Sequence, residues 1–180
     1  PTVLVTPAAP AICIGGCVSL TASGASTYTW SPATGLSATT GATVNACPTV
    51  TTTYTVTGTN ASGCTDTQPV TVTVNPVPTV LVTPAAPAIC IGGCVSLTAS
   101  CASTYTWSPA TGLSATTGAT VNACPTVTTT YTVTGTNASG CTDTQPVTVT
   151  VNPLPTVSVI PANPTICPSS CITLTASGAS

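Results

Sequence analysis

One heptapeptide occurs twice in this chain: STYTWSP, at residues 26–32 and again at residues 103–109. Within it, Tyr28 and Trp30 are two residues apart, so in a β-strand both side chains face one side and the threonines face the other. Phe and Met are absent from the whole chain, which leaves Trp30 and Trp107 as the largest apolar groups that a core can use. We therefore expect β-sheets whose small, β-branched side chains pack around these tryptophans.

The composition is that of a strand-rich protein with almost no charge. Thr supplies about a quarter of the residues and Val is abundant, which favours strands over helices. Lys, Arg and His are absent, and Asp66 and Asp143 are the only acidic residues. Without cations the chain cannot neutralise phosphates, so nucleic acid and anionic lipid are excluded as partners. A net charge of −2 also leaves little repulsion between copies, so we expect self-association.

The cysteines indicate the compartment. Eleven cysteines in a chain without His predict disulfides and an oxidising, extracellular location, at the cell surface or secreted. A thiolate metal site is the alternative, but four thiolates without a nearby cation would be hard to hold here, so no metal is expected. No apolar run reaches the roughly 18 residues of a membrane span, so membrane insertion is not expected. Pro1 lies inside a repeat, so we expect any signal peptide to have been removed or to lie outside this sequence.

The chain is a tandem repeat with a period of 77 residues, the spacing of Pro1, Pro78 and Pro155. The first and second copies differ only where Gly24 corresponds to Cys101 and Val77 to Leu154. The predicted domains are residues 1–75, residues 76–152 and residues 153–180, the last holding the first two strands of an incomplete third repeat. Two strands cannot bury a core, so further residues or another chain should complete that repeat. Paired prolines at both junctions predict stiff spacers that keep the domains in line.

Alternating apolar residues predict the strands of one copy. Val3 and Val5 should face inward and Leu4 outward in a first strand that prolines interrupt. The other residues expected to face inward are Val18, Leu20, Ala22, Tyr28, Trp30, Val44, Ala46, Tyr54, Val56, Val70, Val72 and Val74, and the expected core aromatics of both copies are Trp30, Trp107, Tyr54 and Tyr131. Residues 13–17 should form a tight turn, residues 32–41 a loop or short strand, and residues 60–63 a hairpin turn. Seven strands in about 75 residues, with a Trp on the third, are typical of an immunoglobulin-like (Ig-like) sandwich.

Three motifs carry a family resemblance: YTWSPATGLS at residues 28–37, TTTYTVTGT at residues 51–59 and Gly-Cys at residues 63–64. Together they resemble the PKD-like or Ig-like repeats of very large surface proteins of Bacteroidota, which include gliding and biofilm adhesins exported by the type IX route. The resemblance covers both full copies and the start of the third, and it implies an all-β array outside the cell. The chain departs from it after Trp30, where PKD domains usually have an acidic Trp-Asp-Phe-Gly-Asp-Gly stretch. No calcium role is therefore carried over.

An Ig-like topology predicts which cysteines meet within one copy. The turn with Cys13 and Cys17 lies at the end of the sandwich where the fifth strand finishes at Cys47. The Cys64 hairpin lies at the opposite end. We therefore predict Cys17–Cys47 and Cys94–Cys124 bonds, which close loops of about 31 residues and contribute roughly 2–4 kcal/mol each.

Cys13 is then too far from Cys64 of its own copy, but in a head-to-tail array it faces the hairpin of the next copy. This predicts an inter-domain bond between Cys13 and Cys141, with Cys64 and Cys90 making the same bond to further neighbours. A local Cys13–Cys17 clip is the alternative. Cys101 could pair with Cys141, stay reduced or cross-link a second chain, or it could be a neutral replacement of glycine.

Other candidate sites are few. Asn60 and Asn137 each begin an Asn-Ala-Ser pattern for N-glycosylation at a predicted hairpin, where turn formation is the simpler interpretation. Asp66 is a single carboxylate per copy, and without His or Lys neither acid–base pairs nor nucleophilic triads can form. We therefore expect no enzyme activity, no catalytic residue and no cofactor.

The sequence thus predicts a structural component of an extracellular filament or long surface adhesin, built as a stiff array of disulfide-stapled Ig-like repeats. Its expected partner is itself, through head-to-tail domains and lateral copies. The alternative is a multivalent module that binds surface glycans or another ligand on its loops. Cross-β stacking of the strands is a further alternative, but frequent Pro and Gly oppose it.

Overall fold

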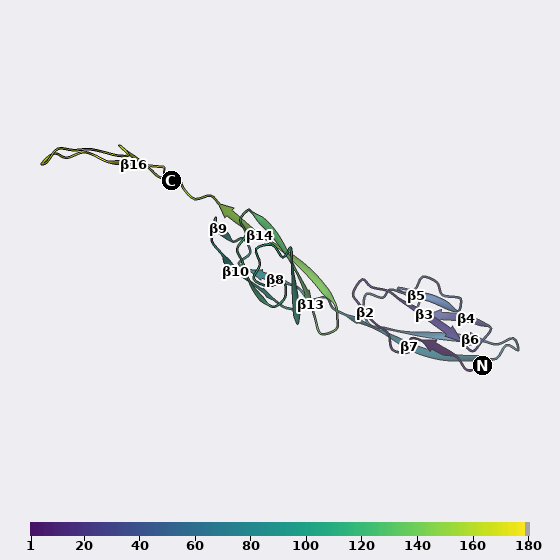
Figure 1. The fold of residues 1–180 in the computed structure, drawn as a ribbon. Coiled ribbons are helices and arrows are strands. Elements are labelled where there is room, and N and C mark those ends of the chain that lie inside the picture. Colours follow the sequence, from purple (N-terminus) through teal and green to yellow (C-terminus); the bar gives the residue numbers. More distant parts are fainter. Residues whose placement is uncertain (179–180) are drawn as a thin grey trace. The chain divides into compact units, whose positions relative to one another are not determined.

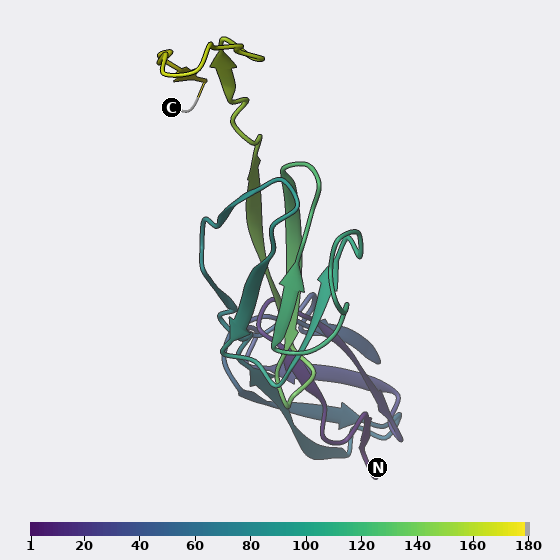
Figure 2. The ribbon, with the colours of Figure 1, turned by 60° about the vertical axis from the view of Figure 1, so that its left-hand side comes forward.

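The computed structural model describes residues 1–178 and, over that range, contains strands, turns and loops without a helix (Figures 1 and 2). The described residues accordingly include no helix able to cross a membrane. The chain divides into two compact units. The first unit consists of Pro1–Leu81, Cys101–Tyr105 and Thr134–Thr144, and the second of Val82–Ser100, Thr106–Val133 and the residues from Gln145 on. The predicted domain boundaries stay a prediction.

Each full copy contributes seven strands. In the first copy they are β1 (Leu4–Thr6), β2 (Ala11–Cys13), β3 (Val18–Ser23), β4 (Thr27–Ser31), β5 (Thr43–Ala46), β6 (Thr52–Thr59) and β7 (Thr65–Asn75). In the second they are β8 (Leu81–Thr83), β9 (Ala88–Cys90), β10 (Val95–Ser100), β11 (Thr104–Ser108), β12 (Thr120–Ala123), β13 (Thr129–Thr136) and β14 (Thr142–Asn152).

The strands of each copy form two sheets. In the first copy the orders are β1-β3-β5 and β2-β7-β6-β4, and in the second β8-β10-β12 and β9-β14-β13-β11. All pairings in the first copy are antiparallel except that of β2 with β7, which is parallel. A two-layer sandwich follows, because each sheet has one apolar face that only the other sheet can cover.

The N-terminal segment crosses from one sheet to the other. β1 pairs with β3, and after the prolines at positions 7 and 10 the chain rejoins as β2 beside β7, with Cys13 opposite Asn75. The prediction of a turn over residues 13–17 is correct at residues 14–15, which form a turn that Gly16 N–H closes by donating to the Cys13 carbonyl at 2.8 Å. It misses β2, so Trp30 lies on the fourth strand and not on the third.

The core is built from small aliphatic side chains around a few aromatics. Trp30 and Tyr54 of the first copy are 3 % and 0 % exposed, and Trp107 and Tyr131 of the second have the same values. Leu4 faces outward as predicted, at 59 % exposure. The Trp30 indole donates to the Gly41 carbonyl at 2.9 Å, and the Tyr54 hydroxyl donates to the Thr34 carbonyl at 2.8 Å. Burial raises the pKa of the Tyr54 phenol.

The predicted loop at residues 32–41 contains no named strand, but it covers a free edge of both sheets. Beside β4, Trp30 N–H donates to the Thr39 carbonyl at 2.8 Å. Beside β5, Ser37 N–H donates to the Asn45 carbonyl at 2.8 Å. Native sheets often block open edges with charged side chains, and this chain uses its own backbone instead.

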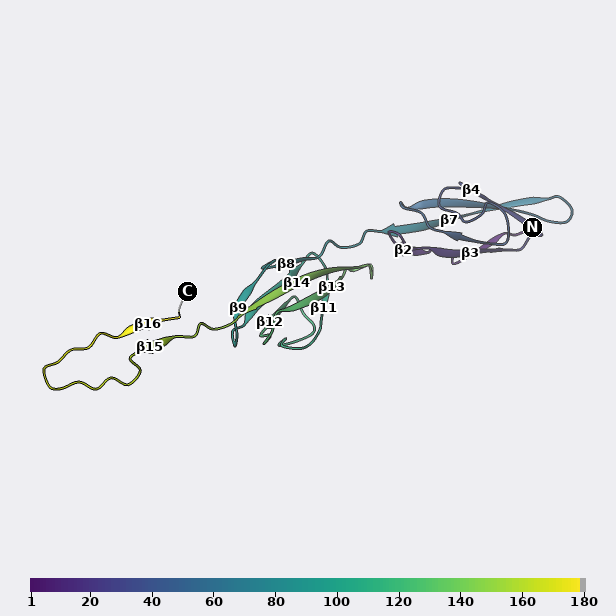
Figure 3. The same ribbon diagram turned by 90° about the horizontal axis from the view of Figure 1, so that it is seen from above.

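The third copy contributes β15 (Ser158–Ile160) and β16 (Thr175–Ser177), which pair antiparallel (Figure 3). Its large apolar side chains are exposed to solvent within the described range. Val157 is 60 % exposed, whereas Val3 at the same position of the first copy is 2 % exposed. The pairing that corresponds to β1 with β3 therefore forms without a second sheet to cover it.

A single carboxylate holds the first residues of each full copy. Val3 N–H donates to Asp66 Oδ2 at 2.8 Å, and Val80 N–H donates to Asp143 Oδ2 at 2.9 Å. This hydrogen bond from Val3, with a second from the Thr67 backbone, lowers the pKa of Asp66. Since the folded-state pKa lies below the unfolded value, Asp66 stabilises the fold at neutral pH, and this contribution is lost as the pH falls through the folded pKa.

We predict that acidification below about pH 4, the ordinary titration range of Asp, lowers the melting temperature of the wild type more than that of Asp66→Asn. The amide of Asp66→Asn still offers an oxygen to Val3 but does not titrate. Circular dichroism melts from pH 2 to pH 7 test this. Equal acid sensitivity of both proteins would show that Asp66 does not hold the N-terminal strand.

Gly58 of β6 packs against the side chains of Val3 and Ala25 and leaves no room for a Cβ. A Cβ there would sit 2.5 Å from Cγ2 of Val3 and 2.7 Å from Cβ of Ala25. We predict that Gly58→Ala lowers the free energy of unfolding by about 1–3 kcal/mol through overpacking. Denaturant titration measures this, and Thr57→Ala on the outward face of the same strand is the matched control, with a change within about 0.5 kcal/mol. Equal effects of the two substitutions would contradict the packing argument.

Candidate functional site

The chemically distinctive part of the chain is a group of residues that we call the cystine joint: Cys13, Asn75, Pro76, Asn137 and Cys141. All five belong to the first compact unit. A disulfide connects Cys13 to Cys141, with their Cα atoms 5.6 Å apart and a sequence separation of 128. The bond therefore connects the first copy to the hairpin of the second.

β2 and β7 position Cys13. It is the last residue of β2, it lies opposite Asn75 in the parallel ladder, and the N–H of the following Ile14 donates to the Asn75 carbonyl at 2.9 Å. The parallel pairing brings the end of β2 beside the last residue of β7, where the linker to the second copy begins. Backbone hydrogen bonds thus hold Cys13 beside Asn75, the residue that precedes Pro76.

The side chain of Asn137 organises the other half of the joint. Its Oδ1 accepts hydrogen bonds from the N–H groups of Ser139 and Cys141, both at 3.0 Å, which closes the turn before Cys141. Its Nδ2 donates to the Pro76 carbonyl at 2.8 Å. The one amide therefore fixes the hairpin and also binds the linker.

Asn137 and Asn60 also begin the two N-glycosylation patterns, for which turn formation was the simpler interpretation. Both lie half-buried in hairpin turns, and in both the side-chain oxygen accepts two backbone N–H groups. The nitrogen that a glycan would occupy at Asn137 is the one bonded to Pro76. A glycan on Asn137 would therefore have to displace or crowd this contact.

Two further disulfides staple the copies internally. Cys17 bonds Cys47, and Cys94 bonds Cys124, each pair with its Cα atoms 4.2 Å apart. Because Val18 lies opposite Ala46 in the β3–β5 ladder, the first bond extends that ladder by one residue. It therefore fastens two strands of one sheet, whereas the antibody-type bond joins the two sheets.

The remaining cysteines differ in their surroundings. Cys64, Cys90, Cys167 and Cys171 carry free, exposed thiols. Cys101 is exposed and has a φ of +72°, close to the left-handed backbone of Gly24 at +93° in the first copy. Since Cys141 is bonded to Cys13, the alternative pairing of Cys101 with Cys141 is wrong, and so is the local Cys13–Cys17 clip.

The described residues offer little for catalysis or metal binding. No three His, Cys, Asp or Glu side chains within residues 1–178 lie close enough together to hold a metal ion. The Asp66 carboxylate is engaged by the Val3 N–H. The role of Asp66 in holding the first strand was missed by the sequence analysis, since its partner is 63 residues away and is a backbone group.

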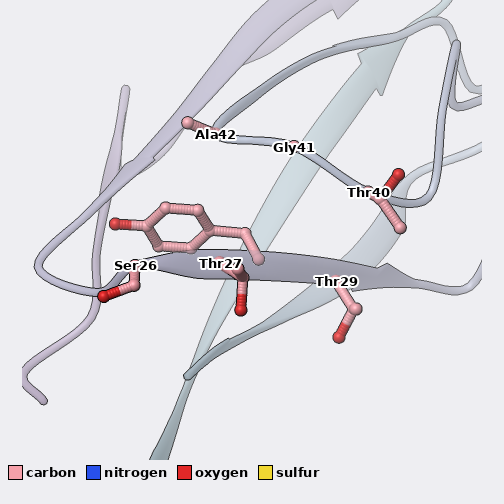
Figure 4. A pocket seen from close by; sticks show the side chains of 7 residues that line it. Ser26, Thr27, Thr29, Thr40, Gly41 and Ala42 are labelled. Carbon is pink, nitrogen blue, oxygen red and sulfur yellow. The ribbon is translucent and has the colours of Figure 1, made fainter. Parts of the chain in front are cut away.

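A pocket of about 410 Å³ lies beside β4 in the first copy and is lined by Ser26, Thr27, Tyr28, Thr29, Thr40, Gly41 and Ala42. The side chains of Thr27 and Thr29 point away from the segment with Gly41 and Ala42 (Figure 4). A specific ligand site needs polar groups that converge on the ligand. These hydroxyls diverge, so the lining does not make a binding site.

The comparisons with known proteins concern the fold. No family model matches the chain, and no curated protein matches its sequence. Among solved structures it is similar to a C-terminal 282-residue fragment of intimin, solved in complex with the intimin-binding domain of the translocated intimin receptor. The TM-score is 0.51 at 16 % identity, over 90 % of this chain and 67 % of that one.

Two other similar structures are tandem Ig modules. DIP-gamma IG1+IG2 gives a TM-score of 0.40 at 13 % identity, over 84 % of this chain and 98 % of that one. The IgVJ-C2 molecule of amphioxus gives 0.36 at 17 % identity, over 78 % and 99 %. The strand order and the three disulfides, with the likeness to intimin, confirm the predicted all-β fold: Ig-like β-sandwiches in tandem, stapled by disulfides.

Proposed function

We propose that this chain is a structural, non-enzymatic part of an extracellular filament or long surface adhesin, and that its work is to carry tension. Its domains are residues 1–75, 76–152 and 153–180, strung as a stiff array. The observation that carries the proposal is the Cys13–Cys141 bond. Among the disulfides of the described residues, it is the one that connects two copies.

The bond changes the covalent path between the chain ends. A force applied at the termini passes from Pro1 to Cys13, crosses the disulfide to Cys141 and leaves through the C-terminal residues. Residues 14–140 lie in a closed loop that the force does not extend. At about 3.3–3.6 Å per residue, the load path of about 53 residues reaches roughly 180 Å, against roughly 620 Å for the whole chain.

The joint and the linker also support stiffness. Prolines at both ends of Pro76–Pro78 restrict the linker to extended conformations. The Asn137 side chain binds the carbonyl of Pro76, and the disulfide flanks it. A hinge at this position would have to break the hydrogen bond and strain the covalent bond.

Chemistry supports a location outside the cell and self-association. Three disulfides persist only where the medium is oxidising. The outward face of β4, β6 and β7 is dominated by threonine, with hydroxyls such as those of Thr53 and Thr71 in contact at 2.8 Å. With no cation and two carboxylates, such faces do not repel a second copy. Lateral copies in a filament are therefore the partners that we propose.

On the resemblance of its motifs to PKD-like repeats of Bacteroidota, we propose that the array is of the gliding or biofilm adhesin type. The intimin fragment was solved with a receptor domain, which is consistent with an adhesive role for such arrays. The pocket beside β4 offers no converging polar groups to a glycan, so we favour the mechanical role.

Single-molecule pulling on handles at the two chain termini tests the proposal. We expect a fully extended length of roughly 180 Å in oxidising buffer and roughly 620 Å in reductant. Cys13→Ser should give roughly 410 Å in oxidising buffer, because the Cys17–Cys47 and Cys94–Cys124 bonds still hide about 30 residues each. Extension of the oxidised wild type to the length of Cys13→Ser would refute the load path.

A further inference from the structure

We propose that the chain carries two open halves of the cystine joint and that a second copy of the chain binds them. The hairpin half is residues 60–64 of the first copy, and the strand half is Cys90 with Asn152 and Pro153 of the second. In the resulting assembly, Cys64 of one chain bonds Cys90 of the next. The inference rests on the proposed function and specifies how the array continues.

The strand half repeats the environment of Cys13. Cys90 lies opposite Asn152 in the parallel ladder of β9 and β14, and Ile91 N–H donates to the Asn152 carbonyl at 2.9 Å. Gly93 N–H donates to the Cys90 carbonyl at 2.8 Å, the distance found between Gly16 and Cys13. Pro153 stands where Pro76 offers its carbonyl to Asn137. Each element that receives the hairpin in the formed joint is present again.

The hairpin half repeats the environment of Cys141. Asn60 Oδ1 accepts from Ser62 N–H at 3.0 Å and from Cys64 N–H at 2.9 Å, and Asn60 N–H donates to the Cys64 carbonyl at 3.0 Å. The corresponding distances at Asn137 are 3.0, 3.0 and 2.9 Å. The turn is thus already in its bonded shape, so association does not have to order it.

The cysteines of the open halves are more exposed to solvent than the cysteines of the formed joint. Cys64 is exposed, whereas Cys141 in the same turn is 1 % exposed. Cys90 is exposed, whereas Cys13 on the equivalent strand is half-buried. The sequences around these pairs are identical. The formed joint is therefore a bound complex of one copy of the hairpin with one copy of the strand end, and it shows what the open halves accept.

Cys167 corresponds to Cys90 in the third copy, but its surroundings differ. The third copy pairs only β15 with β16, so within residues 1–178 no parallel strand lies beside Cys167 to supply the Asn and Pro carbonyls. Cys90 is the thiol that has a complete strand half.

Bond formation needs an oxidant, and a small-molecule disulfide such as oxidised glutathione supplies it. The Cys64 thiolate attacks the small disulfide and releases one thiol, and the Cys90 thiolate then attacks the mixed disulfide and releases the second. Two cysteine thiols are oxidised to one disulfide, and one small disulfide is reduced to two thiols. The two protons leave to solvent and are taken up by the released thiolates.

The test uses the whole chain in a glutathione redox buffer, followed by non-reducing electrophoresis. Peptide mapping with chymotrypsin suits this chain, since it has no Lys or Arg for trypsin. We expect a ladder of covalent oligomers that contains a Cys64–Cys90 peptide. Cys64→Ser and Cys90→Ser should each lose the ladder, and a mixture of the two should give a covalent dimer without higher species. Cys167→Ser is the matched control and should keep the ladder.

Asn60→Asp separates docking from random oxidation. The carboxylate keeps the oxygen that orders the turn but removes the donor that the joint requires, so the Cys64–Cys90 bond should form about three- to tenfold more slowly. A monomer whose Cys64 and Cys90 both remain open to alkylation would overturn the proposal, as would oligomers linked through other cysteines. Either result leaves the pulling response of single chains unchanged, so the two proposals can fail separately.

Discussion

The buried indole of Trp30 is the contact on which core packing, loop position and edge protection all depend. A buried aromatic removes about 150–250 Å² from water, worth roughly 4–6 kcal/mol at about 25 cal/mol per Å², in a core otherwise made of Val, Ala and Leu. Its Nε1–H holds the Gly41 carbonyl at 2.9 Å. The loop that ends there is thereby fixed along both sheets. In a chain without lysine to guard its strand edges, one side chain thus supports both the interior and the border of the sandwich.

The disulfides add stability that a core of this composition cannot supply by burying apolar surface. A sandwich of this size without Phe or Met has little apolar surface to bury, so covalent bonds are expected to add to its stability. The Cys17–Cys47 bond continues a ladder that hydrogen bonds have already set. The Cys13–Cys141 bond depends on non-local geometry: a parallel strand pair on one side and an asparagine-closed turn on the other. The first bond fastens a sheet, and the second fastens one copy to another.

Alternation in the sequence was enough to predict the long antiparallel strands and the outward position of Leu4, since most inward residues are Val, Leu, Tyr or Trp and recur at every second position. It could not predict β2, because a strand of three residues has no visible period and its hydrogen bonds go to β7, far along the chain. The edge-covering role of residues 35–41 was hidden for a similar reason, since backbone groups make these contacts and leave no trace in side-chain pattern. Asp66 looked like a lone carboxylate until its partner, the Val3 N–H, was located.

The ring closed by the Cys13–Cys141 bond also bears on how such a chain could be dismantled. Processive degradation machines pull a polypeptide through a narrow pore from one end. Here the translocated strand would branch at Cys13 if pulled from the N-terminus, or at Cys141 if pulled from the other end. Two strands would then have to enter the pore side by side. Turnover of the folded array would accordingly begin with reduction of this one bond.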